Sequence, residues 1–201
     1  MLLEQSKFNR VGLIPARWGS SRFEGKPLAL ICGESMIKRT YDRASMSKKL
    51  DKVYVVTDDN RIEYHCEIFN IPCIRVDVDC ATGTDRCAIA SEQIDADIYV
   101  NIQGDEPLID PEAIDRLCDY FNPNLGVANA YITIKEPYKV MDNDVVKVVF
   151  DAHHCAMYYS RLGIPFPRGE DAKVNQHVDD DGISVDTPKD IKLVEDRLNA
   201  S

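Results

Sequence analysis

A short basic segment near the N-terminus carries side chains that could bind a polyphosphate. Residues 14–28 read Ile-Pro-Ala-Arg-Trp-Gly-Ser-Ser-Arg-Phe-Glu-Gly-Lys-Pro-Leu. Arg17, Arg22 and Lys26 bring three positive charges within ten residues of a chain whose net charge is −10. Anions bind where backbone N–H groups, hydroxyls and positive charge converge. The segment therefore predicts a phosphate-binding loop; the alternative is a solvated basic turn.

The glycine spacing of this segment differs from that of two common phosphate loops. It contains neither G-x-x-x-x-G-K-[ST] nor G-x-G-x-x-G. Gly19, Ser20 and Ser21 offer backbone donors and hydroxyls, and Gly25 permits a close approach of the backbone. A different nucleotide-binding fold is expected.

The elements that must position this loop alternate between short apolar runs and helical patterns. The apolar run Val11–Ile14 suits a central parallel strand, and Pro15 ends it because proline has no backbone donor. Strands are predicted near 11–15, 53–57, 72–76 and 98–102. The alternation predicts an α/β fold with a mostly parallel, Rossmann-like sheet and helices on both faces.

Helices are expected between and after these strands, over 36–44, 87–94, 111–121 and from Pro188 onward. Asp110 is the expected N-cap of the third helix and Thr187 that of the last, whose apolar face contains Ile191, Val194 and Leu198. Strand-like alternation over 126–134, 145–150 and 155–160 predicts a mixed C-terminal part.

An acidic residue follows the predicted strand 98–102. Gln103, Gly104 and Asp105 lie there, at the same sheet edge as the basic loop, because ligands bind beyond the carboxyl ends of parallel strands. Mg²⁺ is held by one or two carboxylates together with phosphates and water. Asp105 is therefore predicted to bind Mg²⁺; the alternative is an aspartate that caps the turn.

Other polar clusters are interpreted as structural. Three consecutive acids at 179–181 cannot all face one ion and predict a solvated turn. His65, His153 and His154 lack partners at metal-ligand spacing. The pair at 58–59 follows a strand and is expected to cap a helix; the alternative is a contact with the nucleotide.

Composition favours a soluble enzyme of one domain spanning residues 1–201. The chain is 44% hydrophobic and 29% charged, enough for one sizeable core. Seven scattered cysteines without a C-x-x-C pair predict small core residues in a reducing cytoplasm. No run approaches the roughly 20 apolar residues that span a bilayer, and no leader is recognised, so neither membrane nor export is expected. The acidic balance argues against a nucleic acid polymer as partner.

Four separated segments together resemble a known family, the cytidylyltransferases that activate 3-deoxy-manno-octulosonate (KDO) as its CMP conjugate. They are residues 14–28, Thr-Gly-Thr-Asp-Arg at 82–86, Asn-Ile-Gln-Gly-Asp-Glu-Pro at 101–107 and Val-Asp-Thr-Pro-Lys-Asp at 185–190. Tyr-Ser-Arg at 159–161 and Ile-Pro at 164–165 add weaker support. The segments span nearly the whole chain in family order.

The resemblance implies transfer of CMP from CTP to the anomeric hydroxyl of KDO, with release of pyrophosphate, in lipopolysaccharide biosynthesis. CMP-sialic acid type and 8-amino-KDO enzymes are near alternatives, as is a nucleotide-binding homologue without transfer activity. The catalytic residues it implies are Arg22, Lys26, Asp105 and Asp186, with Mg²⁺ held by the two aspartates; for Asp186 the alternative is a simple turn into the last helix.

The remaining implied residues bind CTP or the sugar acid. The nucleotide-binding set is Pro15, Ala16, Arg17, Ser20, Ser21, Thr82, Gly83, Arg86 and Gln103. The substrate-binding set is Gln103, Arg161 and His177. Arg161 suits a sugar carboxylate, although a structural salt bridge would explain it equally well.

The chain departs from the family pattern between Val178 and Val185. The family carries there a Gly-Ile-Tyr strand, a Glu-Gln-Leu-Arg helix and a further strand, which supply part of the sugar pocket and much of the homodimer contact. Here the sugar and dimer lobe is shortened around residues 178–184. Either the sequence lacks a stretch of a longer chain, or the protein is a shortened homologue; a homodimer is in doubt in both cases.

Overall fold

A computed structural model describes residues 8–19, 23–121, 126–164, 177–178 and 188–200. The described residues fall into two compact units, which divide after Asp119. The first unit holds the chain up to Asp119 and the C-terminal helix, and the second holds residues from Tyr120 to the strand β10 (His177–Val178). The single domain expected from the sequence stays a prediction.

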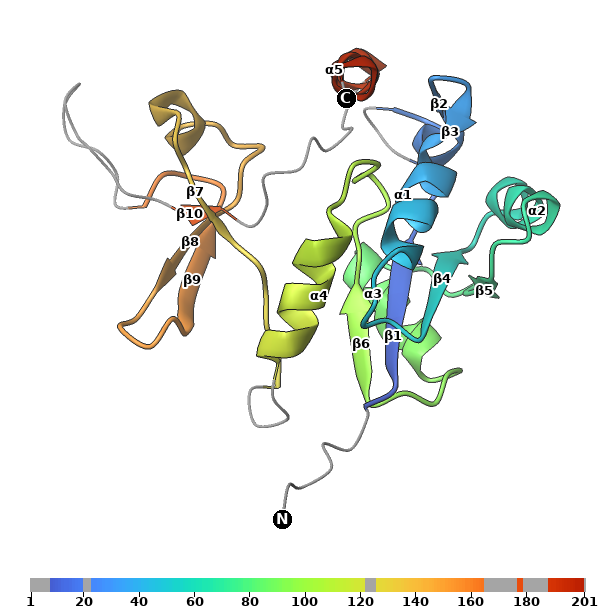
Figure 1. The fold of residues 1–201 in the computed structure, drawn as a ribbon, viewed down its shortest axis with the longest axis horizontal. Coiled ribbons are helices and arrows are strands. Elements are labelled where there is room, and N and C mark those ends of the chain that lie inside the picture. The colour runs from blue at the N-terminus through green and yellow to red at the C-terminus, as the bar shows by residue number, and fades with distance from the viewer. Residues whose placement is uncertain (1–7, 20–22, 122–125, 165–176, 179–187, 201) are drawn as a thin grey trace. The chain divides into compact units, whose positions relative to one another are not determined.

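The first unit is built on a parallel sheet of four strands in the order β5-β4-β1-β6 (Figure 1). These strands are β1 (Arg10–Pro15), β4 (Lys52–Thr57), β5 (Cys73–Arg75) and β6 (Ile98–Asn101). All three pairings are parallel, with Leu13 of β1 opposite Tyr54 of β4 and Asn101 of β6. The four predicted strands and their parallel arrangement are confirmed.

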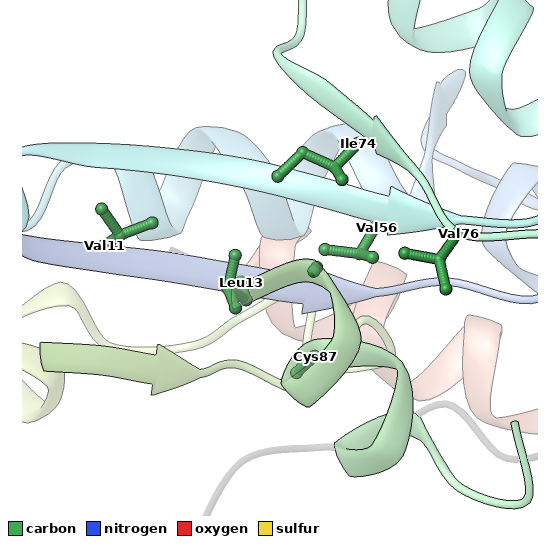
Figure 2. Packing of buried hydrophobic residues seen from close by; sticks show 7 residues of the cluster. Val11, Leu13, Val56, Ile74, Val76 and Cys87 are labelled. Atoms are coloured by element: carbon green, nitrogen blue, oxygen red, sulfur yellow. The ribbon is translucent and has the colours of Figure 1, made fainter. Parts of the chain in front are cut away.

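Alternate residues of β1 face opposite sides of this sheet, and a helix covers each side. On one side Val11 and Leu13 pack with α3 (Gly83–Ser91) in a buried cluster that also contains Val56, Ile74, Val76, Cys87 and Ala90 (Figure 2). On the other side, Ile14 and Ile37 of α1 (Met36–Ser45) both lie next to Gly104: a Cβ built on Gly104 would be 3.5 Å from Ile14 and 3.6 Å from Ile37. The predicted coverage of both faces is confirmed.

Two further helices of this unit begin at aspartate caps. The Asp59 carboxylate accepts the Arg61 N–H and caps α2 (Asn60–Ile68), as the sequence predicts. Asp110 accepts the backbone N–H of Glu112 at the start of α4 (Pro111–Tyr120). The helix predicted from residue 87 is displaced: α3 begins at Gly83, because Thr82 and Asp85 form a capping box there.

The last helix returns to the first unit. Helix α5 (Pro188–Asn199) packs Val194, Ile191 and Leu198 in a cluster with Ile31 and Met36, which confirms its predicted apolar face. Ile31 belongs to the short hairpin of β2 (Leu30–Ile31) and β3 (Glu34–Ser35), which follows a 3₁₀ turn, η1 (Lys26–Leu28). The predicted cap Thr187 lies outside the described residues.

The second unit is a sheet in the order β7-β10-β8-β9, whose described pairs are all antiparallel. Its elements are β7 (Ile132–Thr133), η2 (Pro137–Val140), β8 (Lys147–Phe150), β9 (Ala156–Ser160) and β10 (His177–Val178). The strand predicted over 126–134 was too long, since only Ile132–Thr133 pairs. The sequence predicts mixed pairing for this C-terminal part, whereas the described strand pairs there are all antiparallel and form a separate sheet.

The cysteines follow the sequence expectation only in part. Cys66, Cys87 and Cys118 are buried, and burial raises the pKa of the Cys87 thiol to about 12. Cys32 and Cys155 are exposed, so their interpretation as core residues was wrong. Within the described part of the chain, the helices are too short or too polar to cross a membrane.

Candidate active site

A cavity of about 220 Å³ opens where β1 and β6 end and α3 begins. Segments far apart in the sequence supply its walls, as expected for the carboxyl edge of a parallel sheet. Nine residues predicted from the sequence line it: Pro15, Ala16, Arg17, Lys26, Thr82, Gly83, Arg86, Gln103 and Asp105. The structure thus brings the basic loop, the start of α3 and the acidic turn to one cavity.

Lys26 and Asp105 form an ion pair in the wall of this cavity. The Lys26 Nζ donates to Asp105 Oδ2 at 2.7 Å, and their side chains are 12% and 27% exposed. An ammonium and a carboxylate at this distance neutralise each other in the cavity wall. When a ligand with phosphates and a cation binds, the Lys26 ammonium can contact the phosphates and the Asp105 carboxylate can contact the cation.

Gly104 lets the backbones of β1 and the acidic turn approach closely. A Cβ built on Gly104 would lie 2.6 Å from the Pro15 carbonyl oxygen. Real Cβ atoms essentially never make so short a contact. The Gly104 carbonyl accepts the Thr40 hydroxyl of α1 at 3.2 Å. Any side chain here must displace backbone next to Asp105.

Gly104→Ala is therefore expected to destabilise the protein by roughly 2–3 kcal/mol, through overpacking against backbone. Urea unfolding followed by circular dichroism measures this change. Gly19→Ala is the matched control, because a Cβ there meets nothing within 4 Å. Equal stability of the two variants would contradict the close approach.

The N-terminus of α3 forms another wall. Asp85 N–H donates to Thr82 Oγ1 at 3.1 Å, and the Thr82 N–H donates to Asp85 Oδ2 at 2.9 Å. A Cβ on Gly83 would lie 3.1 Å from Pro15, so the glycine lets the helix start close to the end of β1. Helix N-termini offer donors and partial positive charge to polar or anionic ligands.

Arg86 contributes a buried guanidinium to the wall, paired with the partly exposed carboxylate of Asp58. Its side chain is 5% exposed and donates to Asp58 Oδ2 at 2.6 Å and to the Val76 carbonyl at 3.1 Å. The pair ties α3 to the residues that follow β4 and β5. In the free protein Arg86 thus holds the wall of the cavity.

Some predicted residues cannot be placed at this cavity. Ser20, Ser21, Arg22 and Asp186 lie outside the described residues, as does the side chain of His177. The backbone of His177 belongs to β10, between β7 and β8. The Arg161 guanidinium, also in the second unit, donates to the Asn143 and Asp144 carbonyls at 3.0 and 3.4 Å.

Four cavity residues were not predicted from the sequence as site residues: Pro27, Met36, Cys80 and Gly104. Pro27 and Gly104 adjoin predicted residues, so the motifs themselves could have indicated them. Met36 and Cys80 carry no recognisable binding signal. Met36 reaches the cavity from the first residue of α1, and Cys80 precedes the cap of α3.

The parallel sheet and its cavity of basic, acidic and helix N-terminal groups define an α/β nucleotidyltransferase. The comparisons with known proteins agree. A family model described as cytidylyltransferase matches residues 11–195. The chain therefore belongs to the cytidylyltransferase family and is a nucleotidyltransferase.

Similar proteins include two 8-amino-3,8-dideoxy-manno-octulosonate cytidylyltransferases. The one from Shewanella loihica is 44% identical over 165 residues, which cover 79% of this chain and 67% of the relative. The one from Shewanella frigidimarina is 45% identical over 173 residues, covering 83% and 71%. Since a larger share of this chain is covered, the relatives are longer.

Solved structures support the same fold. The structure of CMP:2-keto-3-deoxy-manno-octonic acid synthetase complexed with CTP has a TM-score of 0.78 and 35% identity, covering 87% of this chain and 72% of that one. A 4-diphosphocytidyl-2C-methyl-D-erythritol synthase has a TM-score of 0.61 at 11% identity, which supports the fold alone. The family resemblance read from the sequence is confirmed.

Proposed function

We propose that this protein transfers CMP from CTP to the anomeric hydroxyl of a 3-deoxy-manno-octulosonate sugar acid, with release of pyrophosphate, for lipopolysaccharide biosynthesis. The observation that carries this proposal is the cavity that joins Arg17, Lys26 and Asp105. Cations suit the triphosphate, and a carboxylate suits the cation that accompanies it. The similarity to a synthetase complexed with CTP supports the choice of nucleotide.

The reaction needs positioning and charge stabilisation more than a covalent enzyme intermediate. The sugar oxygen forms a bond to the α-phosphorus, the bond from that phosphorus to the bridging oxygen of pyrophosphate breaks, and the hydroxyl proton passes to solvent water. In this proposal Lys26 and Arg17 bind the phosphates and stabilise the negative charge that grows on pyrophosphate. The donors at the start of α3 orient the nucleotide.

Asp105 is the proposed magnesium ligand of the described chain. Among the residues that the structure describes, His, Cys, Asp and Glu side chains do not gather in groups of three or more that could hold a metal. One carboxylate at a triphosphate site nevertheless fits Mg²⁺, which takes most of its ligands from phosphates and water. Bound Mg²⁺ would supply Lewis-acid stabilisation of the phosphates.

Asp186 is proposed as the second carboxylate. It precedes α5 by two residues, and α5 packs in the cluster that contains Met36, itself a residue of the cavity wall. The resemblance of residues 185–190 to the family motif supports this role for Asp186.

The sugar acid has two candidates within one class. The sequence resemblance favours KDO itself. Relatives named for the 8-amino-3,8-dideoxy sugar are 43–45% identical, against 35% for the CMP:2-keto-3-deoxy-manno-octonic acid synthetase. These identities support the 8-amino sugar as the alternative substrate.

Pyrophosphate release from CTP and Mg²⁺, measured with each of the two sugar acids and with a sialic acid, tests the proposal. We expect turnover with at least one octulosonate and kcat/KM for the sialic acid lower by about a hundredfold or more, because a misfitting sugar leaves polar groups unpaired. The ratio of the two octulosonate values identifies the sugar. CTP binding without turnover on any sugar acid would contradict the proposed reaction.

A further inference from the structure

Trp18 lies between two cationic residues of the cavity wall, Arg17 and Lys26. It follows Arg17 directly, and its carbonyl accepts the Gly25 N–H at 3.0 Å, one residue before Lys26. Its indole Nε1 donates to Glu24 Oε1 at 3.0 Å. Trp18 therefore holds together the two ends of the segment that contains Arg17 and Lys26.

Gly25 is shaped to receive the indole. It is buried and has φ 67°, in the left-handed region, at the start of η1. A Cβ there would lie 2.9 Å from two carbon atoms of the Trp18 ring. The ring thus rests directly on the backbone from which the Lys26 side chain departs toward Asp105.

A second element fixes the ring. The Arg61 guanidinium lies 3.5 Å from the centroid of the Trp18 ring, the geometry of a cation–π contact. Asp59 holds Arg61 by two hydrogen bonds, of 2.9 Å to Nε and 2.6 Å to Nη2. The Arg61 guanidinium also keeps the pKa of the Asp59 carboxyl below its usual value, so this pair stays charged at neutral pH.

The chain of contacts runs from the sheet to the cavity. The Asp59 N–H donates to the Thr57 hydroxyl at the end of β4 at 3.1 Å, which anchors the cap of α2. Arg61 lies on Trp18, Trp18 lies on Gly25, and Lys26 follows. Trp18 itself is not among the residues that line the cavity.

We propose that Trp18, with Arg61 stacked on it, is a positioning residue that aims Lys26 and Arg17 at the triphosphate of CTP. This inference rests on the proposed binding of CTP by Lys26. Trp18 acts through the cations and not on the ligand itself. Removing the ring then loosens the cations without removing their charge.

Calorimetric CTP affinity and initial rates of Trp18→Ala and Trp18→Phe test the proposal. We expect Trp18→Ala to raise Kd and KM for CTP about tenfold, because the loosened cations lose the equivalent of one charged contact with the triphosphate. KM for the sugar acid should stay unchanged. Trp18→Phe keeps an aromatic plane against Gly25 and Arg61 and should stay within about threefold of the wild type. Tyr64→Ala is the matched control, because Tyr64 is an exposed aromatic residue of α2, the helix that also contains Arg61.

A purely structural role predicts a different pattern. Loss of folded enzyme lowers kcat and leaves both KM values unchanged. If Trp18 acts through Lys26 and Arg17, Trp18→Ala weakens CTP binding by a smaller factor in a Lys26→Ala background than in the wild type, because the contribution through Lys26 is already removed. Losses that multiply would overturn the proposal, as would unchanged CTP affinity of Trp18→Ala.

Arg61→Ala keeps the proposal testable if Trp18→Ala fails to fold. It leaves the basic segment intact and should weaken CTP binding about threefold, with a change in the emission of Trp18, the single tryptophan of the chain. Unchanged CTP affinity of Arg61→Ala would then refute the positioning role of Trp18 and Arg61. Unchanged affinity of Lys26→Ala would instead refute the proposed function, which separates the two failures.

Discussion

Asp105→Ala is expected to abolish nucleotidyl transfer while the protein stays folded. Metal-ion stabilisation of transition-state charge is worth several kcal/mol, so kcat/KM should fall by about a thousandfold. The fold should tolerate the change, because the Asp105 side chain is 27% exposed and its ion pair with Lys26 lies at a cavity wall. Loss of this partly buried, charge-assisted contact should cost about 1.5–3 kcal/mol, which is less than the roughly 5–15 kcal/mol by which a typical domain is stable.

Asp105→Asn separates charge from shape in the same experiment. The amide keeps the volume of the side chain but is a poor ligand for Mg²⁺. Pyrophosphate release measured across a Mg²⁺ titration should therefore fall in both variants, and Glu92→Ala, an exposed carboxylate after α3, should leave it unchanged. Near-normal turnover of Asp105→Asn would contradict the proposed role of Asp105 as a Mg²⁺ ligand.

The sequence predicts the first unit well because local rules and global topology agree there. Val11–Ile14 is apolar throughout, as a central parallel strand must be, and it lies between β4 and β6. Once strand order is parallel, the residues after β1 and β6 must meet at one edge. The convergence of Lys26 and Asp105 could thus be predicted without coordinates.

Other features depend on contacts that no local pattern encodes. The burial of Arg86 follows from Asp58, which is 28 residues away in sequence. The stack of Arg61 on Trp18 joins α2 to the basic segment, and neither residue carries a signal of it. In the second unit β7 covers only Ile132–Thr133 of the predicted range 126–134, so alternation alone did not extend the strand over the described residues before it.

Lys26→Ala should raise the Kd for CTP by about 10- to 100-fold, because a charge-assisted hydrogen bond in a partly desolvated site contributes roughly 1.5–3 kcal/mol. Binding of CMP should change far less, since in this proposal Lys26 binds the phosphates that leave as pyrophosphate. Calorimetry with the two nucleotides measures the difference, with the exposed Lys192 of α5 changed to alanine as control.

The same substitution has an opposite effect on the cation. Lys26 Nζ lies 2.7 Å from Asp105 Oδ2 in the free protein, so the ammonium and a metal ion compete for one carboxylate. Removing the ammonium should lower the Mg²⁺ concentration that gives half-maximal CTP binding, although CTP binds more weakly at every Mg²⁺ concentration. Weaker CTP binding together with a higher Mg²⁺ requirement would mean that Lys26 supports the metal site rather than competing with it, and unchanged CTP affinity would remove Lys26 from the triphosphate site.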